Sequence, residues 1–214
     1  MKNILIIGAS EFGKHFAKKS TELGNEVCIV DIDEKAIHSF VDDYENTLIG
    51  DCRDINVLRQ IGVNHFDVCV VSVGGDFQAS LEITANLKEL DAACVIAQCQ
   101  SENQAKFLKM AGANRTVYPE KETAEKIAYV CNSEKIIDFF EVNAGAKIVK
   151  LSVPHKWVGK SIVELNVRQK FNVIVIAIEQ GDSVIIPEAG TVFGENDLVM
   201  IFGKDEHLRK IIKE

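Results

Sequence analysis

The sequence predicts an α/β protein in which a doubly wound parallel sheet is followed by a smaller, strand-rich α+β module. Over the first 132 residues, short apolar runs alternate with amphipathic segments. This pattern is typical of βαβ units and of a parallel sheet with helices on both faces. Beyond residue 132, apolar runs follow one another at short spacing, separated by turn sequences such as NAG and EQGDS. We therefore expect two domains, at residues 1–132 and 133–214, with a connecting segment at the start of the second.

Six strand–helix units are expected in the first domain, the number in a complete doubly wound nucleotide-binding domain. The apolar stretches VCVV and CVIA are typical of interior strands that are buried on both faces. The expected strands are 3–8, 26–31, 46–51, 66–73, 93–99 and 115–120. The expected helices are at about 11–23, 33–41, 54–60, 76–90, 101–110 and 120–131.

The second domain is expected to contain five strands and two helical segments. Its apolar runs are the length of strands and are bounded by glycine- and asparagine-containing turns. The expected strands are 135–142, 146–153, 172–178, 183–187 and 197–203, and the helical segments are 161–171 and 204–213.

Composition narrows the classes of function. The 214 residues carry a net charge of −8, whereas a nucleic-acid-binding surface is normally basic, so we expect no nucleic acid partner. The longest apolar run, VIVIAI at 173–178, is far shorter than a membrane span, and the apolar start of the chain is too short for a signal peptide. The six cysteines form no C-x-x-C pair, and the five histidines lack metal-ligand spacing.

The turn between the first strand and the first helix has the form G-x-S-x-x-G. Gly8 allows a sharp turn at the strand end, and Gly13 allows the helix to pack closely on the sheet. Ser10 stands where a dinucleotide fingerprint has its middle glycine, and its side chain is small and able to donate a hydrogen bond. Phosphates would bind at the helix N-terminus, through backbone amides and the helix dipole. Alone, the motif is also compatible with an ordinary strand-to-helix turn.

The ends of three further strands favour a nucleotide. Asp31 ends the second strand, where an acidic residue binds ribose hydroxyls, and no arginine follows it to hold the 2′-phosphate of NADP. Asp51 ends the third strand near the expected adenine position, or else caps the next short helix. The sequence SVGGD at 72–76 ends the fourth strand at the crevice where the strand order reverses.

Groups that would carry out a reaction are not apparent. The sequence has no evident nucleophile beside a base, no H-E-x-x-H and no P-loop lysine. We therefore expect a protein without enzymatic activity, for which a bound nucleotide is a signal. An NAD-dependent oxidoreductase is the alternative, and it would need a catalytic His, Lys or Tyr at the nicotinamide end.

The chain also resembles a known family. The segments ILIIGASEFG, VCIVDID, LIGDCRDINVLRQIGV, DVCVVSVGGD and AKFLKMAGANRTVYPEKETAEKIA are similar to the RCK (KTN) domain of Trk/Ktr-type potassium uptake regulators. The sequence from VGKSIVELNV to DLVMIFG is similar to their C-terminal lobe, and one copy of each indicates the single-RCK type. The resemblance implies a cytoplasmic regulatory subunit, peripherally associated with the inner face of the cell membrane through a partner.

The partner implied by the resemblance is a membrane potassium-translocating subunit of the TrkH/KtrB type. The regulator would self-associate as a dimer and as a tetramer-of-dimers ring beneath the pore. ATP, ADP or NAD(H) in the N-terminal crevice would set the shape of the ring. The same modules also serve other cation channels and exchangers, which is a second alternative.

Carried over residue by residue, the resemblance implies an adenine-nucleotide site. Its residues are Gly8, Ala9, Ser10, Glu11, Phe12 and Gly13 in the phosphate loop, Asp31 and Ile32 at the ribose, Asp51 and Cys52 at the adenine, Val73 and Gly74 at the rim, and Gln98 after the fifth strand. Glu120 matches a family acidic position near the dimer interface that is associated with a cation, although it would also favour the N-terminus of the following helix.

Two positions depart from the family pattern. Glu11 stands where many members have an arginine that reaches phosphate, and Gln98 stands where a lysine or arginine often follows the fifth strand. Loss of both cations weakens binding of a triphosphate most, because its terminal charge lacks a partner. We therefore expect NAD(H) or ADP to be favoured over ATP. Lys14 either compensates or points to solvent.

A second ligand site is expected in the C-terminal lobe. Arg168, Asn172, Val173, Ile174 and Pro187 occur in an order similar to that of family members whose lobe binds cyclic di-AMP at the dimer interface. In those members an arginine meets phosphate and apolar residues flank adenine. The alternative is a structural arginine on a short helix and a proline at a strand end.

Overall fold

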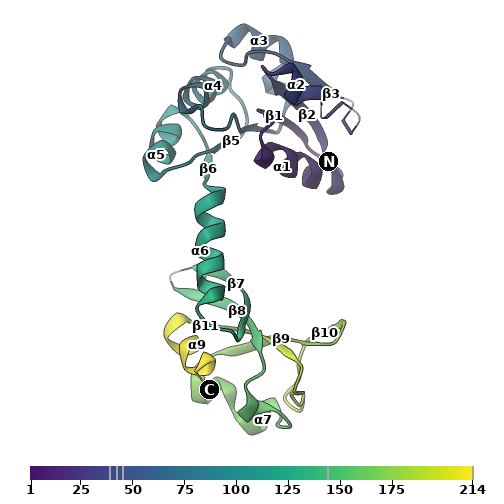
Figure 1. Ribbon diagram of the computed structural model, residues 1–214, viewed down its shortest axis with the longest axis vertical. Coiled ribbons are helices and arrows are strands. Elements are labelled where there is room, and N and C mark those ends of the chain that lie inside the picture. Colours follow the sequence, from purple (N-terminus) through teal and green to yellow (C-terminus); the bar gives the residue numbers. More distant parts are fainter. Residues whose placement is uncertain (39, 42, 45, 144, 214) are drawn as a thin grey trace. The chain divides into compact units, whose positions relative to one another are not determined.

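The computed structural model describes residues 1–38, 40–41, 43–44, 46–143 and 145–213 (Figure 1). The chain divides into two compact units, Met1–Lys121 and Glu122–Glu214. The division lies at the start of helix α6 (Pro119–Cys131), whereas the sequence places the boundary after residue 132, at the end of that helix. Most of α6 belongs to the second unit because its C-terminal half packs there.

The first unit is built on a six-stranded parallel sheet in the order β3-β2-β1-β4-β5-β6. The strands are β1 (Asn3–Ile7), β2 (Glu26–Asp31), β3 (Asn46–Ile49), β4 (Val68–Val71), β5 (Val95–Gln98) and β6 (Arg115–Val117). The helices between them are α1 (Glu11–Glu22), α2 (Glu34–His38), α3 (Ile55–Ile61), α4 (Phe77–Glu89) and α5 (Glu102–Ala111). This strand order is that of the Rossmann-like doubly wound fold, so the predicted fold class is confirmed.

One helix of this unit is shorter than the sequence predicts. A helix is expected at 33–41, but α2 ends at His38. Residue 39 of the expected helix lies outside the described residues. Phe40 lies in a turn, and its backbone amide donates to the carbonyl of Ile37 at 2.8 Å.

Alternation along β1 divides the core between the two faces of the sheet. Ile4 and Ile6 pack in one cluster with residues of α1 and α2, whereas Leu5 and Ile7 pack in another with residues of α3, α4 and α5. All four side chains are at most 5% exposed. The central strand is therefore covered on both faces, as the near-continuous apolar sequence predicts.

The strand order reverses at β1, which pairs with β2 on one side and with β4 on the other. In doubly wound sheets the helices that follow two such strands lie on opposite faces, and a crevice opens between them at the carboxyl ends of the strands. The G-x-S-x-x-G loop follows β1 at this edge of the sheet. The fold thus places the loop at the expected ligand position.

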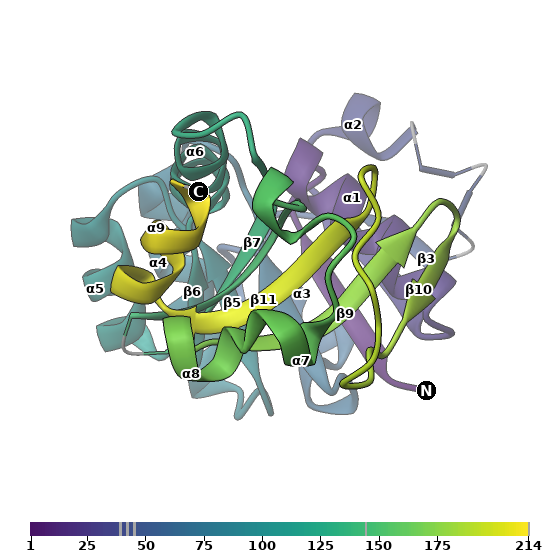
Figure 2. The same cartoon turned by 90° about the horizontal axis from the view of Figure 1, so that it is seen from below.

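The second unit contains a five-stranded antiparallel sheet in the order β10-β9-β11-β8-β7. The strands are β7 (Ile136–Asn143), β8 (Ala146–Ser152), β9 (Ile174–Gln180), β10 (Ser183–Ile185) and β11 (Leu198–Lys204). The helices are α7 (Ile162–Leu165), α8 (Val167–Phe171) and α9 (Asp205–Ile212), of which α8 and α9 pack together (Figure 2). Trp157 and Phe193 lie in its core with ring centroids 5.3 Å apart, and each is 1% exposed.

Two asparagines interrupt the segment that the sequence predicts as one helix at 161–171. Asn166, with φ +49°, ends α7, and Asn172, with φ +54°, ends α8. Asparagine adopts this left-handed conformation more readily than most residues, so each position stops a helix. Strand β9 consequently begins at Ile174 rather than at residue 172.

The C-terminal half of α6 is held against the second unit by an aromatic contact and an ionic cluster. The ring of Tyr129 lies 4.1 Å from that of Phe139, and the Tyr129 hydroxyl donates to the carboxylate of Asp205 at 3.2 Å. Lys147 Nζ and Arg209 Nε donate to the same carboxylate at 3.1 and 2.6 Å. Burial alone raises the pKa of Asp205, but hydrogen bonds and charge from Lys147 and Arg209 bring it below its ordinary value.

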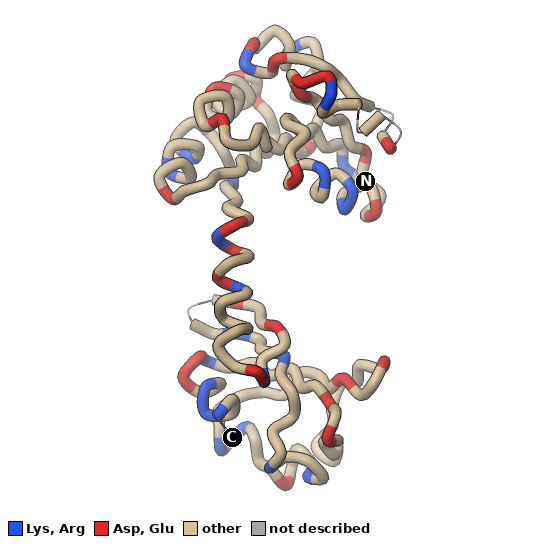
Figure 3. Tube along the Cα trace, in the orientation of Figure 1, with Lys and Arg blue, Asp and Glu red and all other residues tan. Residues whose placement is uncertain are grey.

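Charged residues of both signs are interspersed along both units, and both signs occur in α6 (Figure 3). Of the net charge of −8, residues 1–121 carry −6 and residues 122–214 carry −2. Among the described residues, no helix is both long and apolar enough to span a bilayer.

Candidate functional site

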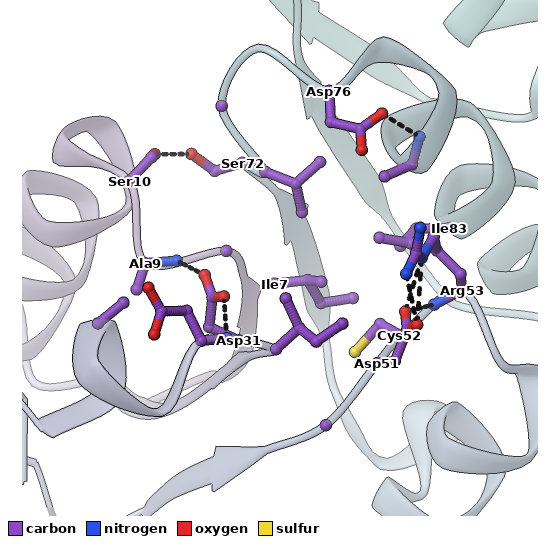
Figure 4. Close-up of a pocket in the computed structure, with 18 residues that line it drawn as sticks. Ile7, Ala9, Ser10, Asp31, Asp51, Cys52, Arg53, Ser72, Asp76 and Ile83 are labelled. Atoms are coloured by element: carbon purple, nitrogen blue, oxygen red, sulfur yellow. Dashed lines mark hydrogen bonds and ion pairs between the residues drawn. The ribbon is translucent and has the colours of Figure 1, made fainter.

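A pocket of about 360 Å³ opens at the carboxyl ends of the central strands (Figure 4). It is lined by Ile7, Gly8, Ala9, Ser10, Asp31, Ile32, Asp33, Ala36, Gly50, Asp51, Cys52, Arg53, Ser72, Val73, Gly74, Asp76, Ala79 and Ile83. Apolar side chains thus form part of the wall, with a small number of polar groups among them. This combination is typical of pockets that bind small molecules.

The glycine loop packs against the neighbouring backbone so closely that no side chain fits. Gly8 has φ +105°, and a Cβ on it would lie 2.2 Å from the carbonyl oxygen of Ser72. A Cβ on Gly13 would lie 2.5 Å from the carbonyl oxygen of Gly8. The missing side chains let helix α1 and the end of β4 approach the loop, as the dinucleotide fingerprint requires.

Ser10 begins helix α1 and leaves two backbone amides available. Its Oγ accepts a hydrogen bond from the Gly13 amide at 3.2 Å, which caps the helix. Within the described protein no acceptor binds the amides of Glu11 and Phe12, which belong to the unpaired first turn of a twelve-residue helix. These amides and the helix dipole favour a phosphate at this point.

Ser10 also begins a chain of polar side chains that crosses the sheet. Its hydroxyl is hydrogen-bonded to that of Ser72, and Ser72 Oγ donates to Gln98 Oε1 at 2.8 Å. Because Ser10 Oγ accepts from Gly13 and Ser72 donates to Gln98, the Ser10 hydroxyl is the donor to Ser72. Ser72 is fully buried. These hydrogen-bonded side chains therefore connect the glycine loop to the carboxyl ends of β4 and β5.

Asp31 is fixed by two backbone amides. Its Oδ2 accepts from the Ala9 amide at 2.6 Å, and its Oδ1 accepts from the Asp33 amide at 2.8 Å. The carboxylate thus joins the end of β2 to the glycine loop, and it lines the pocket beside Ala9 (Figure 4). A carboxylate held in this position keeps lone pairs for the hydroxyl groups of a ribose.

Asp51 and Arg53 form a two-pronged ion pair on another wall of the pocket. Arg53 Nε donates to Asp51 Oδ1 at 2.9 Å, and Arg53 Nη2 donates to Oδ2 at 2.7 Å. These side-chain hydrogen bonds lower the pKa of Asp51. The alternative role of Asp51 as a helix cap is wrong, because Asp54 caps α3 by accepting from the Asn56 amide at 2.9 Å.

Cys52, beside this pair, is 3% exposed. Burial raises the pKa of its thiol to about 12, so the thiol is protonated at neutral pH and is not activated as a nucleophile.

The structure brings nine of the residues expected at the nucleotide site into the pocket wall. These are Gly8, Ala9, Ser10, Asp31, Ile32, Asp51, Cys52, Val73 and Gly74. Glu11, Phe12, Gly13 and Gln98 are not among its lining residues. Glu11 is exposed and pairs with Lys14 at 2.9 Å, and Phe12 packs in the core on one face of the sheet. Lys14 therefore neutralises Glu11 rather than facing the pocket.

Three charged residues of the wall, Asp33, Arg53 and Asp76, were not among the predicted site residues, although Asp76 ends the SVGGD segment that was placed at the crevice. Asp33 follows β2, Arg53 follows Asp51, and Asp76 caps helix α4 by accepting from the Ala79 amide at 2.9 Å. Their place in the sequence could have identified them, because each of the three residues lies within a few residues of the end of a strand that meets the crevice. Four carboxylates and one guanidinium thus line the pocket within the described chain.

The residues expected at a second ligand site lie along α8, β9 and the segment after β10. Arg168 is on α8, Asn172 Nδ2 lies 3.3 Å from His207 Nε2, and Ile174 is 49% exposed. Val173 is 2% exposed and packs in the core, so its side chain faces away from any ligand. Cyclic di-AMP binding by the other four residues stays a prediction.

Glu120 is the second residue of α6 and is exposed. Within the described part of this chain, no three His, Cys, Asp or Glu side chains gather as a metal site. A cation at Glu120 would need ligands from another molecule, and it stays a prediction.

The fold and the pocket define the class: a doubly wound α/β domain, which binds ligands at the switch point of its sheet, joined to a small antiparallel domain. Two protein-family models match the chain and identify its family. The TrkA-N domain model matches residues 4–119, and the TrkA-C domain model matches residues 147–214. The chain belongs to the TrkA-N family, and the resemblance to Trk/Ktr-type proteins is confirmed.

Two relatives from Bacillus subtilis match over nearly the full length of both chains. The Ktr system potassium uptake protein C is 30% identical over 203 residues, which cover 94% of this chain and 92% of the relative. The Ktr system potassium uptake protein A is 30% identical over 214 residues, which cover 100% of this chain and 96% of the relative.

Solved structures show the same fold at lower identity. The RCK domain of GsuK matches with a TM-score of 0.71 and 18% identity, and the GsuK channel bound to NAD matches with a TM-score of 0.72 and 19% identity. Both cover all of this chain, which spans 48% and 40% of their lengths. At this identity the likeness shows the fold alone.

Proposed function

We propose that the protein is a nucleotide-sensing regulatory subunit of a potassium transport system. The observation that carries this proposal is the pocket at the switch point, with two free amides of α1 and the fixed carboxylate of Asp31, in a chain whose relatives are potassium uptake proteins. The nucleotide acts as a signal. It stabilises one arrangement of a dimer or ring that gates a membrane pore subunit of the TrkH/KtrB type.

The ligand we propose is an adenine nucleotide, with NAD(H) or ADP favoured over ATP. The reason differs from the one that the sequence suggests, because Glu11 lies outside the pocket and is paired with Lys14. Asp51 and the single guanidinium neutralise each other, and the three remaining carboxylates of the wall, those of Asp31, Asp33 and Asp76, oppose added negative charge. A terminal phosphate would therefore meet more repulsion than attraction.

Regulation without chemistry fits the groups in the wall. The Cys52 thiol is protonated, and the described lining residues include no histidine, lysine or tyrosine that would serve as a general acid or base. An NAD-dependent oxidoreductase would consume NADH in the presence of a substrate. We expect the protein to bind NADH without oxidising it when candidate carbonyl substrates are added.

The proposed location is the cytoplasmic face of the membrane, through the pore subunit. A ligand shifts an equilibrium between ring arrangements only by its difference in affinity for them. Small-angle scattering with each nucleotide would reveal distinct shapes, and identical shapes with all of them would contradict the mechanism. Co-purification of a membrane potassium-translocating subunit would support the partner, whereas capture of an exchanger would overturn the assignment to potassium uptake.

Calorimetric titration of the full chain with NADH, ADP and ATP tests the site. We expect saturable binding, with ATP weakest. Asp31→Asn should bind every ligand about tenfold to a hundredfold more weakly, since a lost hydrogen bond to a charged group is worth about 1.5–3 kcal/mol. Asp182→Asn, in the turn between β9 and β10, is the matched control. Absence of binding by the wild type would refute the proposed function, and ATP binding several-fold tighter than both others would refute the preference.

A further inference from the structure

Arg53 is the one basic side chain among the described residues that line the pocket. It lies with Asp51 on the side of the pocket away from Ala9 and Asp31 (Figure 4). Both its backbone and its side chain are held. Its carbonyl oxygen accepts from Asn86 Nδ2 of α4 at 2.8 Å, and its guanidinium donates twice to Asp51. Asp51 therefore orients the guanidinium plane, while Asn86 holds the backbone of Arg53.

The hydrogen bonds of this pair leave donors rather than acceptors for a ligand. Arginine has five N–H donors, and Asp51 engages one on Nε and one on Nη2, so three are uncommitted in this pair. Asp51 Oδ1 already accepts from the amide and from Nε of Arg53, and Oδ2 accepts from Nη2. The carboxylate of Asp51, which the sequence places near adenine, is thus largely occupied by Arg53.

The position of the pair corresponds to the base of a nucleotide. Phosphates are expected at the N-terminus of α1, and the ribose is expected at Asp31, both on the opposite side of the pocket. A ligand extended from there would place its base against the wall formed by Cys52, Arg53 and Ile83. Cys52 and Ile83 are apolar and buried, so they would contact the face of a ring while Arg53 meets its edge.

We propose that Arg53 selects the base, and that the pocket accepts guanine nucleotides as well as adenine nucleotides. This inference rests on the proposed function, that the pocket holds a nucleotide. Guanine presents two acceptors, O6 and N7, which an arginine binds with two N–H groups, whereas adenine presents an N6 amino donor beside N7. The N–H groups of Arg53 that Asp51 does not bind therefore match the two acceptors of the guanine edge. The amino group of adenine would have to bind the acceptor positions of Asp51 that Arg53 leaves open.

Titrations of the full chain with GDP and ADP test the proposal. We expect the wild type to bind GDP within about tenfold of ADP, and Arg53→Ala to weaken GDP relative to ADP by about tenfold, the usual order for one bidentate contact. ADP binding should be unchanged or tighter in this variant, because Asp51 is released. Arg53→Lys should also lose GDP, since an ammonium group cannot make the planar two-pronged contact.

Arg59→Ala is the matched control, because Arg59 lies on α3, bonds to Asn56 Oδ1 at 2.8 Å and does not line the pocket. Circular dichroism of each variant would verify folding. ADP binding without GDP binding by the wild type, or an equal effect of Arg53→Ala on both ligands, would overturn the inference and leave the proposed function standing. If the wild type bound none of GDP, ADP and NADH, the proposed function itself would be overturned.

Discussion

Replacement of Gly8 by alanine tests how tightly the glycine loop is packed against the end of β4. A Cβ at this position would lie 2.2 Å from the carbonyl oxygen of Ser72 and 2.8 Å from the amide nitrogen of Val73. These are backbone atoms, so no rotamer change relieves the contact. The positive φ costs a residue with a side chain about 1–2 kcal/mol, and overpacking costs about 1–3 kcal/mol more.

We therefore expect Gly8→Ala to lower the free energy of unfolding of the first unit by about 2–5 kcal/mol and to abolish nucleotide binding. Gly24→Ala is the matched control, because Gly24 has φ +79° and nothing lies within 4 Å of its added Cβ. Its loss should be limited to the backbone strain, about 1–2 kcal/mol.

Urea unfolding followed by circular dichroism measures the difference between the two variants. With an m-value of about 1–3 kcal/mol/M, a loss of about 3 kcal/mol moves the midpoint by roughly 1 M or more. Trp157, the single tryptophan, is buried in the second unit, so its fluorescence follows that unit separately. Equal destabilisation by Gly8→Ala and Gly24→Ala would refute the proposed clash with the end of β4.

Two further predictions concern the second unit. The pKa of Asp205 in the folded protein lies below its ordinary value of 3.8, so the stability that it contributes is present above that value and is lost as the pH falls through the folded pKa. The test compares the wild type with Asp205→Asn by urea unfolding between pH 5 and 2, roughly one unit above and two units below the ordinary pKa of Asp. The free energy of unfolding of the wild type should fall more over this range, and parallel curves of that free energy against pH would contradict the prediction. Equilibrium dialysis with labelled cyclic di-AMP should show saturable binding that Arg168→Ala weakens, and no saturable binding by the wild type would end the idea of a second ligand site.

The sequence predicted the two sheets because their local signals agree with the final packing. Short apolar runs between turn residues became strands, and the two-faced burial of β1 follows from its uninterrupted apolar sequence. The break in the helix at 161–171 was missed because most of the surrounding residues are compatible with a helix. The left-handed backbone of Asn166, whose amide donates to the carbonyls of Ile162 and Val163, ends α7 there.

At the pocket, the sequence predicted which turns meet but not where each side chain points. Parallel strands bring their carboxyl ends to one edge, so Gly8, Asp31 and Asp51 are assembled by topology alone. The direction of Glu11 depends on its pairing with Lys14, one helical turn away, which position in the loop does not reveal. Arg53 was missed because its role depends on the ion pair with Asp51, which the spacing of the two residues in the sequence does not reveal.

The hydrogen bonds of the glycine loop restrict how a nucleotide signal can begin. The loop is bonded to β2 through Ala9 and Asp31, and to β4 through Ser10 and Ser72, so a ligand that competes for either bond changes how the loop is held. Two nucleotides that differ only in a terminal phosphate produce different states only if that phosphate interacts differently with each state. Because the charged wall is mostly carboxylate, the difference between ADP and ATP would be a repulsion. An arrangement that moves Asp33 or Asp76 away from the phosphates would then be the one that ATP favours.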